Sequence, residues 1–238
     1  MYGYRARIGY TSPPYLTETF PYEFYKIVPK GITLVLTTLA VAKFTDREVE
    51  KSVEMSLEAA REMGRAGVNL IVLGGVPLNL SRGYDGLQLM IQETERDTGV
   101  PVTSSLTAQM NALHALGARK VAVVHPFEQS HGRYGEYLAH YGFEMVGVKG
   151  AGKKVGDLAL TSSEISLDLA RTLHRSHPDA DTFYFPAPHW GIATAIEPLE
   201  RELGLNVVTA LQAIVWESLR RCKIEDRIDG FGRLLKDH

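Results

Sequence analysis

Cysteine is almost missing from this chain of 238 residues, whose single thiol belongs to Cys222. One cysteine excludes an internal disulfide and is typical of the reducing cytoplasm, where we expect the protein to reside. An excess of one charge sign is missing as well, because 26 Lys and Arg residues stand against 28 Asp and Glu residues. Nothing in this balance favours nucleic acid or an anionic membrane surface as a partner.

Long apolar runs are also absent. No stretch approaches the ~20 apolar residues of a membrane span, and the first residues lack the apolar core of a signal peptide. The sequence has no Gly-x-Gly-x-x-Gly after its first expected strand, no phosphate loop ending in Gly-Lys-Ser/Thr, and no Gly-x-Ser-x-Gly elbow. We therefore expect neither a dinucleotide nor a serine nucleophile, and we assign no cofactor.

One segment, His125–His131, places two histidines and a glutamate within seven residues, a composition that invites a metal. The spacing fits no single helical face, and the His-Glu-x-x-His pattern is absent. We therefore assign no metal and expect a surface loop after the fifth strand. An alternative left open is that a histidine of this segment, His125 first, reaches an active-site cleft.

What the sequence does contain is one pattern five times over: a helical stretch, a glycine, and then a short apolar run. Glycine after a helix end takes the left-handed conformation and lets the chain return as a strand. Such repetition predicts βαβ units and a mainly parallel sheet. The expected strands of the pattern are 70–73, 102–103, 121–124, 145–148 and 207–208, and further strands are expected at 6–10, 32–39 and 182–185.

Helix signals accompany the strands. Thr45–Glu48 and Thr161–Glu164 are capping boxes that predict helix starts. Pro198 predicts a late start or a kink in the helix that carries it. No low-complexity linker separates the halves, so we expect two similar α/β lobes with a cleft between them. The first lobe comprises residues 1–115 and 210–238, and the second comprises residues 116–209.

Two expected strands end in loops that lack a nucleophile, Gly74-Gly75-Val76-Pro77 and Pro186–Gly191. In open α/β sheets, ligands bind beyond the carboxyl ends of the strands. The glycine amides either cradle a carboxylate or simply form a tight turn. His189 is the one side chain of the two loops that can move a proton near pH 7, and the alternative is a packed, hydrogen-bonded histidine.

Two further strand ends offer polar groups. Ser12-Pro13-Pro14 is expected as a stiff loop after the first strand, where it either has no ligand or forms a pocket wall. Ser104 and Ser105 precede a helix expected to begin at Leu106 or Thr107, and a serine there either caps the helix or binds an anion.

In order along the chain, several motifs resemble the arylmalonate decarboxylase and maleate cis-trans isomerase group of the Asp/Glu racemase superfamily. They are Ile8-Gly9-Tyr10 with Ser12-Pro13-Pro14, Leu73-Gly74-Gly75 with Ser81-Arg82-Gly83, Ala195–Glu200, and Gly204–Val208. The resemblance covers nearly the whole chain. It implies an α/β fold of two flavodoxin-like parallel-sheet lobes related by a pseudo-twofold axis, with the active site in the cleft between them.

Carried over to this sequence, the family's functional positions are mostly changed. Its first-lobe cysteine falls at Gly75 and its second-lobe cysteine at Ala187, its hydroxyl pair falls at Val76 and Pro77, and a pocket tyrosine falls at Phe127. Alanine cannot protonate a carbanion, and loss of one oxyanion donor costs about 2.7–4 kcal/mol of transition-state stabilisation. The cysteine-dependent mechanism of the family is therefore not supported here.

We expect an enzyme that decarboxylates, cleaves or isomerises a small organic acid or related carbonyl compound by cysteine-independent acid/base chemistry. His189 is the leading acid/base candidate and His125 the second. The expected substrate contacts are Pro14, Gly74, Gly75, Val76, Ser104, Ser105, Phe127, Ala187 and Pro188.

The alternative is a catalytically silent protein that binds or senses a small acid on the same scaffold. A cysteine mechanism through Cys222 would require the last expected helix to point its final turn into the cleft. The substrate is not determined by the sequence, and self-association into a homo-oligomer stays open.

Overall fold

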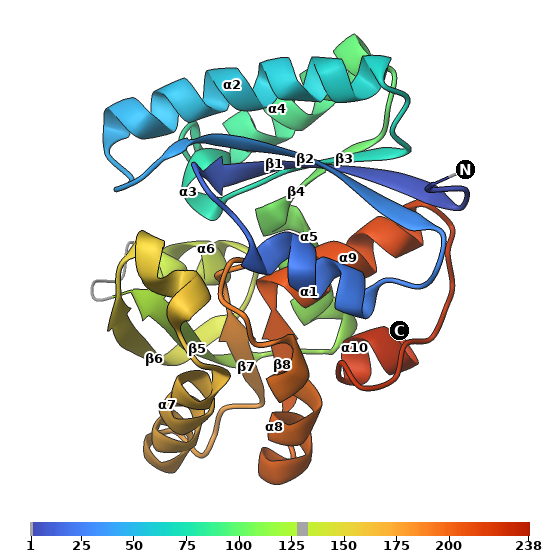
Figure 1. Cartoon of the computed structure of the whole chain (residues 1–238). Coiled ribbons are helices and arrows are strands. Elements are labelled where there is room, and N and C mark those ends of the chain that lie inside the picture. Colours follow the sequence, from blue (N-terminus) through green and yellow to red (C-terminus); the bar gives the residue numbers. More distant parts are fainter. Residues whose placement is uncertain (1, 128–132) are drawn as a thin grey trace. The chain divides into compact units, whose positions relative to one another are not determined.

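The computed structural model describes residues 2–127 and 133–238, which form two compact units (Figure 1). Unit 1 comprises Met1–Thr17, Val28–Ala108 and Ser218–Glu225, and unit 2 comprises Glu18–Ile27, Gln109–Glu217 and Asp226–His238. The expected first lobe ran to residue 115 and resumed at 210, whereas unit 1 ends at Ala108 and takes only Ser218–Glu225 from the C-terminal part.

Unit 1 is built on a four-stranded parallel sheet of order β2-β1-β3-β4. Its strands are β1 (Ala6–Pro14), β2 (Ile32–Val41), β3 (Leu70–Leu73) and β4 (Val102–Ser104). Its helices are α2 (Asp46–Arg65), α3 (Val76–Asn79) and α4 (Gly83–Thr98). Helices α2 and α4 lie together over one face of the sheet, as Figure 1 shows.

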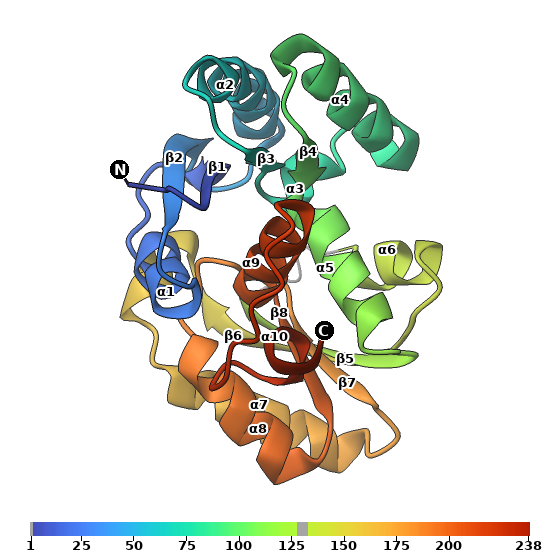
Figure 2. The ribbon, with the colours of Figure 1, turned by 90° about the vertical axis from the view of Figure 1, so that its right-hand side faces the viewer.

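Unit 2 repeats this topology with a parallel sheet of order β6-β5-β7-β8. Its strands are β5 (Lys120–Phe127), β6 (Glu144–Lys153), β7 (Thr182–Phe185) and β8 (Asn206–Thr209). Its helices are α1 (Thr19–Ile27), α6 (Tyr134–His140), η1 (Val155–Leu160), α7 (Ser163–Ser176), η2 (Ala193–Ala195), α8 (Ile196–Leu203) and α10 (Arg233–Asp237). Helices α7 and α8 lie side by side against its core (Figure 2).

Two more helices, α5 (Ser105–Ala115) and α9 (Ala210–Arg221), are each divided between the units. Both sheets thus have the strand order of a doubly wound fold, which confirms the expected α/β class with two parallel sheets. In this order the second strand is added on one side of the first strand, and the third and fourth strands are added on its other side. Each sheet therefore has a topological switch point, between β1 and β3 in unit 1 and between β5 and β7 in unit 2.

The expected strands are all present, and the glycine pattern behaves as predicted. Each of the five glycines has a positive φ, between 66° and 84°. Thr45 and Glu48 form the predicted capping box, but the second box is wrong, because Ser162 caps α7 through the Glu164 amide. Helix α8 begins late, at Ile196, with Pro198 in its first turn.

Two expected loops are strand instead. Ser12, Pro13 and Pro14 belong to β1, which pairs with β2 as far as Pro14 but with β3 only as far as Thr11. Beyond Thr11 one side of β1 has no ladder partner among the described residues, and the register shifts between Ser12 and Pro14, so the prolines are tolerated there. Likewise His125 lies inside β5, while Glu128 and His131 fall outside the described residues.

None of the described helices is long and apolar enough to cross a bilayer.

Candidate functional site

In unit 1 the switch point is formed by the end of β1 and the turn after β3. The Gly74 amide donates to Thr11 Oγ1 at 3.1 Å, and Thr11 Oγ1 lies 2.7 Å from Ser56 Oγ. A Cβ atom at position 74 would overlap the carbonyl oxygen of Thr11. Position 74 is therefore restricted to glycine by close packing, and its amide is already bonded to a side chain of unit 1.

Gly75 holds a conformation that other residues rarely adopt, with φ 85° and ψ 111°. A Cβ atom here would collide with the Pro13 ring. The resemblance places the family's first cysteine here, and in this structure both the backbone conformation and the neighbouring proline disfavour any side chain at this position. Gly75 also precedes the short helix α3, whose first-turn amides at Val76 and Leu78 have no acceptor inside the helix.

Next to this turn, Asn79 connects β3 to the start of α5. Its Nδ2 donates to the Leu73 carbonyl at 3.2 Å, and its Oδ1 accepts from the Leu106 amide at 3.2 Å. Asn79 is 1% exposed and was not predicted from the sequence as a site residue. The sequence offers only a weak indication of this role, because asparagine is common near turns on any protein surface.

Ser104 and Ser105 are fully buried at the junction of β4 and α5. Ser104 Oγ accepts from the Thr107 amide at 3.0 Å and lies 2.8 Å from Thr107 Oγ1. The capping alternative is therefore confirmed for Ser104, and the helix begins at Ser105, one or two residues earlier than expected.

In unit 2 the loop after β7 carries Ala187, Pro188 and His189. A tight turn closes it, with the Trp190 amide donating to the Ala187 carbonyl at 3.2 Å. Trp190 is 1% exposed, and its ring centroid lies 6.3 Å from that of Phe185, so it fills space in the core of unit 2. We call the segment Pro186–Ala195, between β7 and α8, the β7–α8 loop.

The His189 imidazole packs against the ring of Phe20, with centroids 5.6 Å apart and an interplanar angle of 40°. Burial lowers the pKa of His189 to about 4. The side chain is therefore a neutral imidazole at pH 7.

Glu23 of α1 holds the far end of the same loop. Its Oε1 accepts from the Ala193 amide at 3.1 Å, and its Oε2 accepts from the Ile192 amide at 3.3 Å. The residue is 5% exposed, and burial raises the pKa of its carboxyl against the lowering effect of these two amides. The sequence reasoning missed Glu23, although a lone acid at a helix-face position shared with Phe20 and Phe24 was an available signal.

The second acid/base candidate, His125, is 3% exposed in β5. Its ring centroid lies 5.3 Å from that of Tyr134, and a Cβ atom on Gly150 would come within 2.7 Å of its Cε1. The imidazole thus fills the space that Gly150 leaves on the neighbouring strand. Phe127 ends β5 and pairs with Lys153 of β6.

Cys222 lies one residue beyond the end of α9, within the part of unit 1 formed by Ser218–Glu225. It is half-buried, and burial raises the pKa of its thiol. A protonated thiol is a poor nucleophile, so nothing at this position favours the cysteine mechanism. Across the described ranges, no group of three or more His, Cys, Asp or Glu side chains is gathered as for a metal ion.

Two parallel sheets of the same strand order, with small-residue turns where β3 and β7 end, define a two-unit α/β protein of the Asp/Glu racemase-like fold. The family model described as arylmalonate decarboxylase matches residues 8–235. The chain therefore belongs to the arylmalonate decarboxylase family.

Individual relatives agree with this assignment. Arylmalonate decarboxylase of Bordetella bronchiseptica is 25% identical over 233 residues, which cover 97% of this chain and 96% of that one. A liganded double mutant of arylmalonate decarboxylase matches with a TM-score of 0.88 and 24% identity, over 96% of this chain and 98% of that one. Maleate isomerase from Pseudomonas putida S16 matches with a TM-score of 0.87 and 20% identity, over 98% of both chains.

Proposed function

We propose that this protein is a lyase or isomerase that acts on a small carboxylic acid or related carbonyl compound without a catalytic cysteine. The observation that carries the proposal is the family match over residues 8–235. Because of this match, we expect the activity to be a decarboxylation or an isomerisation. The proposal excludes a catalytic cysteine because Gly75 and Ala187 stand at the two positions that the resemblance assigns to cysteine, and neither side chain supplies a proton donor.

The proposed chemistry begins at the two strand-end turns. The first-turn amides at Val76 and Leu78, with the hydroxyl of Ser105, would hold a carboxylate. The Gly74 amide, already bonded to Thr11, would act by shaping the turn. The expected apolar substrate contacts are Pro14 at a strand end of unit 1, and Phe127, Ala187 and Pro188 at strand ends of unit 2.

In a decarboxylation, the bond between the α-carbon and the carboxylate breaks, carbon dioxide leaves, and the electron pair remains as an enolate. His189 would donate a hydrogen bond from its neutral imidazole to the enolate oxygen, a role suited to a histidine of lowered pKa. The α-carbon would then take a proton from the imidazole, and the imidazolate left behind would take a proton from water and release hydroxide.

Replacement of the imidazole tests this assignment. We expect His189→Ala to lower kcat at least ~100-fold while the affinity for the acid changes little, because the imidazole acts on the reacting centre. His140→Gln, at an exposed position of α6, is the matched control, and we expect it to retain turnover. Near-normal kcat in His189→Ala would remove His189 from the mechanism.

A panel of arylmalonates, maleate and hydroxy acids, followed by proton NMR in D₂O, supplies the substrate and separates the two function classes. Product formation or deuterium incorporation at the α-carbon supports the enzyme. The alternative, a silent small-acid binding protein, is favoured by the loss of reactive groups at Gly75 and Ala187. It predicts ligand-induced chemical-shift changes with no product from any acid of the panel.

A further inference from the structure

Helix α1 belongs to a different unit from the two strands that it connects. It connects β1 to β2, both strands of the unit 1 sheet, yet residues 18–27 belong to unit 2. Its buried face presents Phe20, Glu23, Phe24 and Ile27. Three of these side chains are apolar, so the carboxylate of Glu23 is the exception that needs an explanation.

The buried face of α1 lies along the β7–α8 loop. Phe20 is fully buried and packs against the imidazole of His189. One residue beyond Trp190, a Cβ atom on Gly191 would lie 3.1 Å from Thr19 Cγ2 and 3.5 Å from Glu23 Oε1. The loop backbone thus approaches α1 closely at Gly191, and a side chain there would force the two apart.

Directly after Gly191 come the two amides that Glu23 accepts, those of Ile192 and Ala193. A buried carboxylate is costly unless it is hydrogen-bonded, and its charge-assisted bonds to backbone amides are stronger than neutral ones. The two amides face one carboxylate that comes from a different helix, so the contact ties the end of the loop to α1.

We propose that Glu23 is a positioning residue: its carboxylate fixes the Ile192 and Ala193 amides and thereby keeps the His189 imidazole packed against Phe20. The consequence for turnover rests on the proposed role of His189. The structural part, from Glu23 to the imidazole, requires no substrate.

Amide hydrogen exchange measured by NMR tests the first step. Glu23→Ala removes both acceptors, and we expect the protection of the Ile192 and Ala193 amides to fall about 10- to 100-fold. Glu23→Gln retains one acceptor oxygen, so its loss of protection is expected to be intermediate. Glu18→Gln, an exposed carboxylate just before the same helix, is the matched control and is expected to leave both amides protected.

The titration of the His189 imidazole, followed in the same variants, tests the second step. Release of the loop exposes the ring to water, so its pKa is expected to rise from about 4 toward the ordinary ~6.5 in Glu23→Ala. With a substrate in hand, kcat is expected to fall about 10- to 100-fold with little change in KM, as for a misplaced catalytic group. A purely structural role of Glu23 would lower stability without moving the imidazole pKa.

Unchanged amide protection and an unchanged imidazole pKa in Glu23→Ala would overturn the proposal. Loss of both signals with unaltered turnover would overturn its catalytic step, and His189→Ala then shows whether the proposed function fails as well. Where Glu23→Ala does not fold, Glu23→Gln decides by the same measurements.

Discussion

Gly75 has φ 85° and ψ 111°, and the Pro13 ring occupies the space where its Cβ atom would stand. Gly74, one residue earlier, is closed to a side chain by the Thr11 carbonyl. At the first position where the resemblance expects a cysteine, a side chain would therefore meet backbone strain and close contact. At the second position, Ala187, the nearest titratable side chain in the loop is a neutral imidazole, His189.

A substitution at Gly75 measures this restriction. We expect Gly75→Ala to lower the free energy of unfolding by about 2–4 kcal/mol, because backbone strain and the collision with Pro13 add. Gly83→Ala is the matched control: Gly83 has φ 73° with nothing within 4 Å of its Cβ position, so strain alone, about 1 kcal/mol, is expected. Urea denaturation provides both values, and equal losses in the two variants would show that Pro13 does not restrict position 75.

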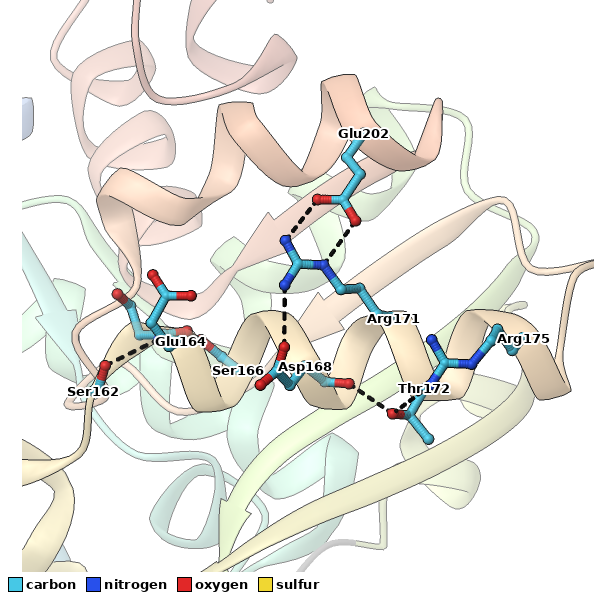
Figure 3. A network of polar contacts seen from close by, with 9 residues as sticks. Ser162, Glu164, Ser166, Asp168, Arg171, Thr172, Arg175 and Glu202 are labelled. Atoms are coloured by element: carbon cyan, nitrogen blue, oxygen red, sulfur yellow. Dashed lines mark hydrogen bonds and ion pairs between the residues drawn. The ribbon is translucent and has the colours of Figure 1, made fainter.

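At the scale of elements, the pair α7 and α8 is joined by a polar clamp (Figure 3). Arg171 of α7 donates from Nε and Nη2 to the two carboxylate oxygens of Glu202 on α8, at 2.7 and 2.8 Å. Its Nη1 donates to Asp168 one turn earlier at 3.1 Å. The fork geometry needs a guanidinium, and the pair lowers the pKa of the Glu202 carboxyl.

We expect Arg171→Lys to lower the melting temperature slightly, because lysine keeps the charge but loses the paired hydrogen bonds. The loss should shrink at about 0.5 M NaCl, since solvent-exposed ion pairs are screened by salt. Arg65→Lys is the control, because Arg65 pairs with Glu62 within the single helix α2. An equal or larger loss in Arg65→Lys would contradict a role of Arg171 in joining α7 to α8. Calorimetry at two salt concentrations is sufficient.

For the whole molecule, the chain order and the division into units do not coincide. Helix α1 leaves the strands it connects and becomes part of unit 2, and helices α5 and α9 are shared. The strand order is nevertheless the same in both sheets, so the repeated topology survives this exchange of helices. Glu23 contacts the β7–α8 loop because α1 belongs to unit 2, as that loop does.

At the scale of the whole molecule, the lowered pKa of His189 is expected to make the free energy of unfolding depend on pH. Its lowered pKa means that the unfolded chain binds a proton first as the pH falls, so the free energy of unfolding should decline from about pH 6.5 to about pH 4. In His189→Gln this decline should be shallower, while exposed His140→Gln should follow the wild type. The difference between variants isolates His189 from the carboxylates that titrate in the same range. Parallel curves for wild type and His189→Gln would contradict a neutral imidazole of lowered pKa.

Much of this protein follows from its sequence. Five glycines predicted the helix ends, because the left-handed conformation is a local property of the backbone, and all five adopt it. The spacing of apolar runs predicted the eight strands, and their alternation with helices predicted parallel sheets. Of the two alternatives for Ser104, a helix cap or an anion site, the structure confirms the cap, which depends on residues only three apart.

Tertiary structure decided what depends on residues distant in the chain. The collision of position 75 with Pro13 and the carboxylate of Glu23 on amides 169 and 170 residues away have no local signature. The lowered pKa of His189 likewise comes from burial in the assembled unit. The sequence by itself determined the elements and their family, because these rest on short-range patterns. Only the packing of α1, β1 and the β7–α8 loop within their units set the geometry around Gly75 and His189, because close contact and desolvation arise when distant segments meet.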